Sequence, residues 1–443
     1  MSHEIVSAGA ATREDRLSLT DIELSVVMPA LGEGENLAVL LPRLNAILSD
    51  LGVASEILVV SRGDDLETRA SCTAGGAELI EENARGYGRA LRAGFERARG
   101  RYVLTMDADL SHPPSFVEAL WRARASAEVL IASRYVPGGR ARMPLTRKLL
   151  SQILNRFFAR GLALPIRDIS SGFRLYRADI LRALPTVASD FDILQQILVR
   201  LYAEGWHVRE LPFDYAPRFR GSSHARVIPF GIAYLRTFRS LWRLRNSLSS
   251  ADYDLRAHDS AIPLQRYWQR RRLAHVKALA ATGRRVLDAG CGSSRILGAL
   301  PAGTVGLDIL ARKLRCARRF GRPLVRASLR ALPFRDGAFD CVVCSQVIEQ
   351  LPREWPVLEE LVRVLAPGGR LVLGTPDYGS WRWRLLESAY RRIVPDARVD
   401  ERITHYDRRQ LVAMCERAGL QLEEERSILG AELILALRKP ARA

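Results

Sequence analysis

The feature that most constrains this 443-residue chain is an alternation of short β runs with amphipathic helices, which occurs twice. The first series opens with a strand over 24–31, a helix over 35–52, a second strand over 56–61 and a third over 101–109. The pattern loosens midway and restarts with the strand in GRRVLDAGCG (283–292). Such alternation is typical of mostly parallel sheets with crossover helices. The sequence therefore predicts an α/β protein with two domains.

Composition and breaks in the pattern set the domain limits. A hydrophobic content of 48% is enough for sizeable cores and excludes a disordered chain. We expect a flexible leader over 1–22, a first domain over 23–225, a basic amphipathic helix and linker over 226–263, and a second domain over 264–443. No stretch approaches the roughly 18 consecutive apolar residues of a membrane-spanning helix.

The charge is strongly positive and almost entirely arginine. Lys plus Arg is 67 and Asp plus Glu is 49, which gives +18. Two acid-free runs, 134–160 and 215–251, carry seven basic residues each. The planar guanidinium binds phosphate well, so phosphorylated substrates, membrane headgroups and nucleic acid are the candidate partners. A solvated surface is the other explanation of such runs.

The six cysteines show no disulfide framework. Cys341 and Cys344 form a CxxC, but they lie in the apolar strand pattern FDCVVCSQV. We predict buried free thiols, which fits a reducing cytoplasm.

Two carboxylates, Asp107 and Asp109, directly follow the apolar strand Tyr102–Met106. Two acids at a strand end can share a hard divalent ion, and Mg²⁺ or Mn²⁺ held there would neutralise a diphosphate leaving group. A helix-capping turn before Pro113 and Pro114 is the alternative for the same residues.

Several ordered motifs extend this signal. NARGYGRALRAGFERARGRYVLTMDADLSHPP (83–114), VVMPALGEGENL (26–37), SRYVPGG (133–139), RDISSGFRLYR (167–177) and the block 191–226 closely resemble family 2 glycosyltransferases, of the dolichol-phosphate mannosyltransferase and polyprenyl-phosphate glycosyltransferase type. The resemblance implies a GT-A fold, a nucleotide-sugar donor and inverting transfer to a polyprenyl-phosphate-type lipid. A lipid phosphate is already anionic near neutral pH, so no strong general base is needed, and positive charge is what holds the two phosphate-bearing substrates together.

The resemblance also implies roles for individual residues. Asp107 and Asp109 would hold the metal and act in catalysis, and Glu33, Asp64 and Asp107 would contact the donor. The remaining residues would bind phosphates or shape the acceptor site: Arg134, Ser171, Arg174 and Arg218.

One departure from the family pattern concerns the donor. The second strand should end in an acidic turn, but it reads Ser61-Arg62-Gly63-Asp64-Asp65. Asp64 or Asp65 could compensate, the donor could differ, or donor binding could be lost.

Two segments, 227–248 and 147–162, have amphipathic spacing with basic residues alongside. Ile232, Leu235 and Phe238 illustrate the spacing in the first. Such helices suit a lipid interface, and packing on their own domain is the equal alternative. Nucleic acid is not expected, because no recognised binding module is present.

The second domain opens with Val286-Leu-Asp-Ala-Gly-Cys-Gly292, a buried strand that runs into a glycine turn. The next strand ends in Asp308, which is placed to take two ribose hydroxyls. These residues alone leave nicotinamide and S-adenosylmethionine open as cofactors.

The segments 332–351 and 359–377 resemble class I S-adenosylmethionine-dependent methyltransferases, which have a Rossmann-like fold. The resemblance implies that Asp288, Gly290 and Gly292 line the methionine end, that Asp308 holds the ribose, and that Gln346 borders the cofactor. Ser328 stands where an acid near adenine is usual. His405 is a candidate base or a structural residue.

These expectations combine into a bifunctional enzyme, peripheral on the cytoplasmic face of the membrane. One domain would glycosylate a polyprenyl-phosphate-type lipid in a metal-dependent reaction, and the other would methylate an acceptor. The alternative is a methyltransferase whose glycosyltransferase-like domain is a non-catalytic module that binds lipid or a partner.

Overall fold

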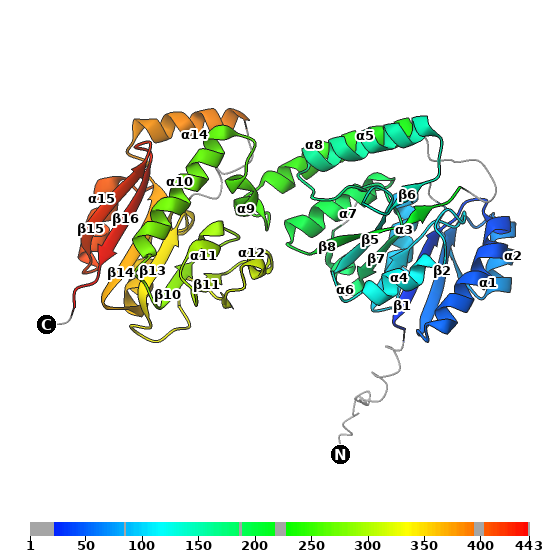
Figure 1. Cartoon of the computed structure of the whole chain (residues 1–443), viewed down its shortest axis with the longest axis horizontal. Coiled ribbons are helices and arrows are strands. Elements are labelled where there is room, and N and C mark those ends of the chain that lie inside the picture. The colour runs from blue at the N-terminus through cyan, green and yellow to red at the C-terminus, as the bar shows by residue number, and fades with distance from the viewer. Residues whose placement is uncertain (1–21, 84–85, 186–187, 218–226, 394–402, 442–443) are drawn as a thin grey trace, which may run out of the picture. The chain divides into compact units, whose positions relative to one another are not determined.

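The computed structural model describes residues 22–83, 86–185, 188–217, 227–393 and 403–441 (Figure 1). They form two compact units. The first comprises the chain up to Leu201 and His207–Trp242, and the second comprises Tyr202–Trp206 and the chain from Arg243. The leader expected over 1–22 lies, apart from its last residue, outside the described residues.

The first unit is built on a seven-stranded sheet with the order β3-β2-β1-β4-β7-β5-β8, in which β7 is antiparallel to both neighbours. The other pairs are parallel, and β1 has β2 on one side and β4 on the other. β1 and β2 are apolar and mostly buried, as expected for parallel strands that are covered on both faces. The strands are β1 (Leu24–Pro29), β2 (Ser55–Ser61), β3 (Glu78–Glu81), β4 (Tyr102–Thr105), β5 (Val129–Ser133), β7 (Arg174–Arg177) and β8 (Val208–Pro212), and the short pair β6 (Arg140–Ala141) and β9 (Asp214–Tyr215) forms a second sheet.

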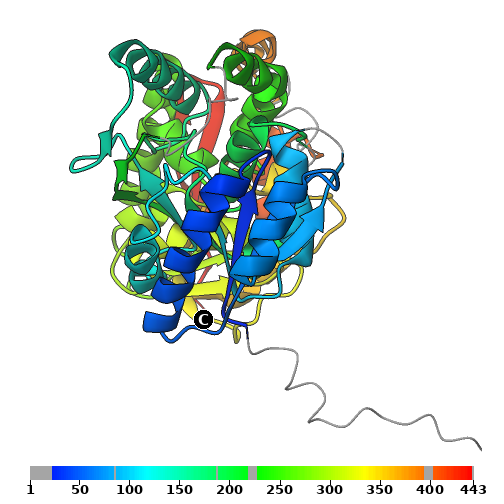
Figure 2. The ribbon, with the colours of Figure 1, turned by 90° about the vertical axis from the view of Figure 1, so that its right-hand side faces the viewer.

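Helices cover this sheet. The helices α1 and α2 lie side by side, as the end view in Figure 2 shows. On another side, α5 and α8 pack together, because the ring of Phe238 lies 6.2 Å from that of Phe157 and 5.9 Å from that of Phe158. The helices are α1 (Gly34–Asp50), α2 (Leu66–Gly75), α3 (Tyr87–Arg97), α4 (Phe116–Ala123), α5 (Leu145–Gly161), α6 (Ala178–Ala183), α7 (Asp192–Ala203) and α8 (Val227–Asn246).

The second unit has a seven-stranded sheet with the order β12-β11-β10-β13-β14-β16-β15, parallel up to β14 and antiparallel beyond it. The elements are α9 (Tyr253–His258), α10 (Pro263–Ala280), β10 (Val286–Ala289), α11 (Arg295–Ala299), β11 (Val305–Asp308), α12 (Ala311–Ala317), η1 (Arg318–Phe320), β12 (Leu324–Arg326), β13 (Phe339–Ser345), η2 (Ile348–Gln350), α13 (Val357–Val364), β14 (Leu365–Pro376), α14 (Trp381–Ile393), α15 (Arg408–Arg417), β15 (Gln421–Ile428) and β16 (Glu432–Arg438). The predicted α/β class is confirmed, with one seven-stranded sheet in each half of the chain.

The segment interpreted as a linker contains structure of its own. It includes α9, and residues from Arg243 onward belong to the second unit. Arg245 is buried and pairs with Asp252 at 2.7 Å, and Asp254 pairs with Lys313 at 2.7 Å. The polar composition of this stretch therefore reflects ion pairs within a folded unit.

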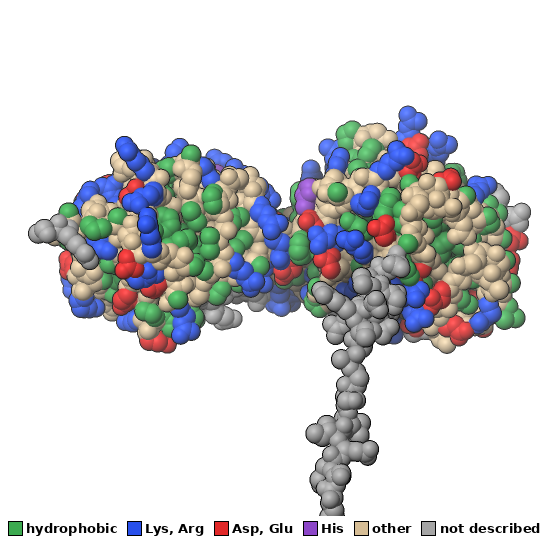
Figure 3. Space-filling model, turned by 90° about the horizontal axis from the view of Figure 1, so that it is seen from below, with side chains coloured by type: hydrophobic (Ala, Val, Ile, Leu, Met, Phe, Trp, Pro, Cys, Tyr) green, Lys and Arg blue, Asp and Glu red, His purple; other side chains and the backbone are tan. Residues whose placement is uncertain are grey.

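Charged side chains are spread over both units. On the face shown in Figure 3, Lys and Arg side chains are interspersed with acidic ones. The six cysteines are free and buried, as the sequence predicts. Among the described residues, no helix is both long enough and apolar enough to cross a bilayer.

Candidate functional site

The predicted metal ligands lie just beyond the carboxyl end of β4, beside the end of the neighbouring strand β1. The side chain of Asp107 is 36% exposed. Its backbone N–H donates to Nδ1 of His112 at 2.9 Å, and Nε2 of the same ring is 3.6 Å from Asp107 Oδ2. His112 is buried and stacks on Phe173 at 4.8 Å. The imidazole therefore holds Asp107 in place from the core side.

Asp109 has a different environment from Asp107. It is buried, and its Oδ1 accepts the backbone N–H of Ser111 at 3.0 Å and the Ser111 hydroxyl at 2.5 Å. Within the described residues, no three His, Cys, Asp or Glu side chains group as metal ligands. A pair of carboxylates still suits Mg²⁺ or Mn²⁺, because such ions commonly complete their shell with substrate phosphates and water.

A loop from another part of the unit meets Asp107 at Gly172. A Cβ atom at Gly172 would lie 2.6 Å from the Tyr87 hydroxyl, so a larger residue would displace Tyr87, and 3.6 Å from Asp107 Oδ1, which is ordinary contact. Tyr87 is stacked on Phe191 at 4.6 Å, and its pKa is raised well above the usual value by burial and then by Asp107.

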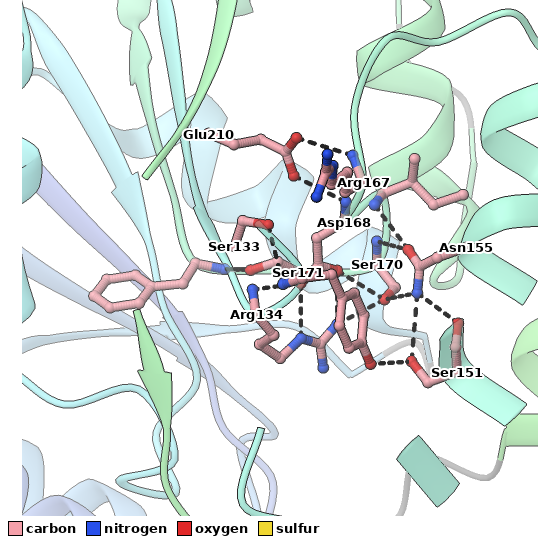
Figure 4. Close-up of polar contacts among 12 residues, drawn as sticks. Ser133, Arg134, Ser151, Asn155, Arg167, Asp168, Ser170, Ser171 and Glu210 are labelled. Carbon is pink, nitrogen blue, oxygen red and sulfur yellow. Dashed lines mark hydrogen bonds and ion pairs between the residues drawn. The ribbon is translucent and has the colours of Figure 1, made fainter. Parts of the chain in front are cut away.

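Arg134 follows β5 and is committed to an ion pair. Its Nε and Nη2 donate to the two oxygens of Asp168 at 2.8 and 2.7 Å, and Nη2 also donates to Ser170 Oγ at 2.7 Å (Figure 4). Burial raises the pKa of Asp168, but Arg134 outweighs burial and leaves that pKa below its usual value. Arg134 thus fixes the loop that begins at Arg167, and its charge is already balanced.

Arg174 is fully buried in β7, and backbone carbonyls surround its guanidinium. It donates to the carbonyls of Ser171 at 2.7 Å, Ile169 at 2.7 Å and Leu194 at 3.0 Å. These bonds tie Arg174 to the backbone of Ser171 and of two other residues. The guanidinium therefore has no exposed surface that could bind a phosphate. Arg218, the remaining arginine expected to bind phosphate or shape the acceptor site, lies outside the described residues.

The predicted donor residues are spread over the turns after β1 and β2. Glu33 is buried, and its Oε2 accepts from Asn36 Nδ2 at 2.5 Å. Asp64 is exposed and pairs with Arg62 at 2.7 Å. The neighbouring Asp65 joins the two turns, because its Oδ2 accepts the N–H of Gly32 at 2.9 Å. Asp65 rather than Asp64 therefore organises this corner.

Asp65 also caps α2. Its Oδ1 accepts the N–H of Thr68 at 3.1 Å, and its Oδ2 accepts the hydroxyl of Ser61 at 3.0 Å. Burial alone would raise the pKa of Asp65. These bonds and the one from Gly32 have the larger effect and leave that pKa below its usual value, so the group stays ionised.

Sequence reasoning did not single out Asn155, Asp168, Glu210 or His112. Asp168 lies inside the motif RDISSGFR and His112 inside DLSHPP, so the motifs themselves were the available signal. Nothing in the sequence marks Asn155 or Glu210, because their partners are backbone amides distant along the chain.

The second unit contains a cavity of about 460 Å³ at the carboxyl end of its parallel strands. The predicted cofactor residues all line it: Asp288, Gly290, Gly292, Asp308 and Gln346. Gly290 has φ of 78°, and a Cβ there would lie 2.5 Å from Val347. The glycine turn therefore brings backbone to the cavity edge, as a nucleotide-type cofactor requires.

Three side chains give this cavity its polarity. Asp308 Oδ2 accepts the N–H of Gly292 at 2.9 Å, and its Oδ1 accepts that of Leu310 at 2.8 Å. Among the described residues, neither Asp288 Oδ2 nor Gln346 Nε2 has a hydrogen-bond partner, although both are buried. Burial and the charge of Asp308 raise the pKa of Asp288 to about 7. A buried carboxylate oxygen and an amide without partners fit a cationic, hydrogen-bonding ligand such as S-adenosylmethionine.

Further residues line this cavity, and one predicted residue, His405, does not. Asp254 of α9 lines the cavity and bonds Lys313, which adds a charged pair at the glycine turn. Ser328 lines it as well. His405 is exposed and stacks on Tyr378 at 4.1 Å, and it is not among the lining residues.

Comparison with family models assigns both halves of the chain. Residues 25–184 match the model of glycosyl transferase family 2, and residues 287–373 match a methyltransferase domain. These matches agree with the two sheets and confirm the GT-A-type and Rossmann-like domains that both resemblances imply.

Curated proteins match the first half. Dolichol-phosphate mannosyltransferase from Pyrococcus furiosus is 33% identical over 239 residues, which cover 50% of this chain and 64% of the relative. The chain thus spans just under two-thirds of that relative's length. Undecaprenyl-phosphate mannosyltransferase from Micrococcus luteus is 33% identical over 206 residues, which cover 44% of this chain and 85% of the relative. Among solved structures, glucosyl-3-phosphoglycerate synthase from Mycobacterium tuberculosis matches with 18% identity and a TM-score of 0.42 over 53% of this chain and 84% of that chain.

Proposed function

Because this chain belongs to glycosyl transferase family 2 through its first half and carries a methyltransferase domain in its second, we propose that it is a bifunctional enzyme. The first unit transfers a sugar from a nucleotide-sugar donor to a polyprenyl-phosphate-type lipid with inversion. The second unit methylates an acceptor with S-adenosylmethionine. The observation that carries the transferase proposal is the partial exposure of the Asp107 carboxylate. This carboxylate lies just beyond the end of β4, next to the loop at Gly172.

Asp107 and Asp109 would hold the divalent cation. When bound, Mg²⁺ or Mn²⁺ supplies positive charge to the diphosphate leaving group. The chain's own residues orient this site: His112 holds Asp107 from behind, and Ser111 holds Asp109. The acceptor oxygen is already anionic, so the site needs no strong base.

Lipid contact is supported by the outer sides of α5 and α8. Leu145, Leu149, Ile153 and Phe157 recur every four residues on α5 and are 82%, 60%, 55% and 55% exposed. On α8, Ile232 and Leu235 are exposed, whereas Tyr234 and Leu241 are buried. Each helix thus packs on its own unit with one side and exposes apolar side chains on the other, and this exposed side supports the proposed lipid contact.

Basic side chains accompany these apolar residues. Arg156, Arg160, Arg236 and Arg239 are exposed on the same two helices. Exposed apolar residues among cations are typical of helices that lie at an anionic lipid surface. We place the protein at the cytoplasmic face of the membrane, and the six free cysteines fit a reducing compartment.

The transferase proposal is tested by incubating the protein with labelled nucleotide sugars, Mn²⁺ or Mg²⁺, and polyprenyl phosphate in vesicles. We expect label in the lipid fraction, loss of at least about 100-fold with Asp107→Asn, and no change with Asp179→Asn, an exposed acid paired with Arg177. Failure of every common donor to label the lipid would refute the transferase activity.

The methyltransferase proposal is tested by calorimetry with S-adenosylmethionine, followed by a screen of the glycolipid product and its precursor as methyl acceptors. We expect binding that Asp308→Asn weakens, because the carboxylate would take the ribose hydroxyls. No heat of binding to the wild-type protein would contradict the proposal.

One observation favours a second candidate function. Ser61 ends β2 and Arg62 follows it where the family pattern has acids, and Arg62 is paired with Asp64. If this corner cannot bind a nucleotide, the first unit is a non-catalytic module that delivers lipid to the methyltransferase. Binding of S-adenosylmethionine without any nucleoside diphosphate binding would favour this candidate.

A further inference from the structure

Asn155 is a buried polar residue on the inward side of α5, and its side-chain amide is fully engaged. Oδ1 accepts the backbone N–H of Ile169 at 2.8 Å and that of Ser170 at 3.1 Å. Nδ2 donates to the Ser151 carbonyl at 2.8 Å and to Ser170 Oγ at 2.9 Å (Figure 4). Because only an oxygen can accept two N–H groups, these bonds also fix the orientation of the amide. One side chain therefore joins α5 to two consecutive residues of the loop 167–172.

The two preceding backbone amides of the same loop are hydrogen-bonded to a side chain of the sheet. Glu210 of β8 accepts the N–H of Arg167 at 2.9 Å with Oε2 and that of Asp168 at 2.9 Å with Oε1 (Figure 4). Four consecutive backbone donors are thus satisfied by two side chains rather than by a strand or helix. Glu210 ties the loop to the rigid sheet, and Asn155 ties it to the outer helix α5.

The other end of the loop lies at the metal-site edge. Gly172 is two residues beyond Ser170, and its carbonyl accepts the hydroxyl of Thr105 at 2.6 Å. A Cβ on Gly172 would be 3.6 Å from Asp107 Oδ1. A small displacement of the loop at Ile169 and Ser170 would therefore change what faces the Asp107 carboxylate.

The opposite side of α5 carries the exposed row of Leu145, Leu149 and Ile153. Phe157 continues the row and is also exposed, but one face of its ring stacks on Phe238 of α8. Asn155 and Phe158 point from the same helix into the unit, where both are buried. The helix thus has an apolar outer side toward solvent and a polar clamp on its inner side, and the clamp acts on the loop beside Asp107.

We infer that Asn155 is a positioning residue, which couples contact of α5 with an anionic lipid surface to the placement of the loop 167–172 beside Asp107. This inference rests on the proposed function, because it takes α5 to face lipid and Asp107 to face the donor. Lipid would hold α5, Asn155 would hold Ile169 and Ser170 against it, and contact with the membrane would strengthen the placement of the loop that these bonds already give. The clamp needs no contact between Asn155 and either substrate.

The test measures hydrogen exchange of the loop amides in the full-length protein. Exchange at Ile169 and Ser170 is compared with and without vesicles of phosphatidylglycerol and phosphatidylcholine, for the wild type and for Asn155→Leu. In the wild type we expect vesicles to slow exchange by about tenfold, the factor that corresponds to one additional stabilised hydrogen bond. In Asn155→Leu we expect fast exchange that vesicles leave unchanged, with flotation on the vesicles retained.

Asn45→Ala is the matched control, because Asn45 is a helical asparagine that donates to the Gly75 carbonyl at 2.8 Å on a different helix. It should respond to vesicles as the wild type does. If Asn155→Leu does not fold, Ser170→Ala replaces it. This substitution removes the hydroxyl that accepts from Asn155 and from Arg134, and it should reduce the vesicle response in part. A wild type that does not bind vesicles, or binds them without slowing these amides, overturns the inference, as does an undiminished response in the variant.

A kinetic readout separates this inference from the transferase proposal. Asn155→Leu should lower turnover of long-chain polyprenyl phosphate in vesicles by about tenfold and leave that of a short, water-soluble prenyl phosphate nearly unchanged. Equal losses on both acceptors would show a merely structural role. If vesicles slow hydrogen exchange at Ile169 and Ser170 as expected but no sugar is transferred, the transferase proposal alone is refuted.

Discussion

Asp288 allows a quantitative test of the second unit. Its carboxyl is buried in the wall of the cavity, its Oδ2 has no hydrogen-bond partner among the described residues, and its pKa is raised to about 7 by burial and by Asp308. A carboxyl whose pKa is higher in the folded protein than in the unfolded chain binds its proton more tightly when folded. This group therefore lowers stability as the pH rises from about 3.8 to about 7, and its whole cost applies above pH 7.

The size of this cost follows from the shift. The difference between about 7 and 3.8 corresponds to about 4 kcal/mol, at roughly 1.36 kcal/mol per unit of pKa. By proton linkage, about 2.5 kcal/mol of this loss of stability occurs between pH 5 and pH 8. Asp288→Asn removes the titration, so the free energy of unfolding of the variant minus that of the wild type should rise by about 2.5 kcal/mol over this range.

The measurement is denaturant-dependent hydrogen exchange of the β10 and β13 amides in the full-length protein at pH 5, 6.5 and 8. These strands pair beside Asp288, so their exchange reports the unfolding of this unit. Asp336→Asn is the control, because it makes the same substitution at an Asp of this unit whose side chain is 81% exposed and does not line the cavity. A difference between Asp288→Asn and the wild type that stays constant from pH 5 to pH 8 would refute the reasoning.

Three further outcomes follow from the contacts described. Arg134→Ala should destabilise the first unit by about 3–5 kcal/mol in thermal or denaturant unfolding, because it leaves Asp168 charged and buried, and a smaller loss would mean that the pair is solvated. Ile153→Glu on α5 should abolish flotation on anionic vesicles and leave the melting temperature unchanged. The control is Leu66→Glu, at an apolar residue that is 72% exposed on α2, and this variant should float normally. Equal behaviour of the two variants would contradict a lipid-facing α5. Removing divalent cations with a chelator should stop sugar transfer and leave methyl transfer intact, which separate radiolabel assays would measure, and a transferase that is insensitive to chelation would argue against the metal at Asp107.

The parts of the site that sequence reasoning found are those whose signal is local. Asp107 follows a strand that its apolar run predicts, and the glycine turn before Gly292 follows another, so parallel-sheet geometry alone puts them at a carboxyl edge. The choice between Asp64 and Asp65 could not be made in this way. Both follow β2, and only the position of Gly32 on the neighbouring turn decides that Asp65 bridges.

Arginines were the hardest residues to interpret. A guanidinium in a motif binds a phosphate, a carboxylate or backbone carbonyls with the same donors, and the sequence does not record which acceptor is near. Arg174 meets three carbonyls, and Arg134 meets Asp168, a residue 34 positions away. Their roles depend on long-range contacts, which periodicity and spacing do not contain.

The short helix α9 determines how the chain could be divided experimentally. Asp254 on α9 and the preceding Leu248 and Ser249 line the cavity of the second unit. A truncated protein that starts at residue 264, the expected start of the second domain, would therefore lose part of the wall of this cavity. A cut placed before Arg243 would keep that wall and give a fragment whose ligand affinity could be compared with that of the whole enzyme.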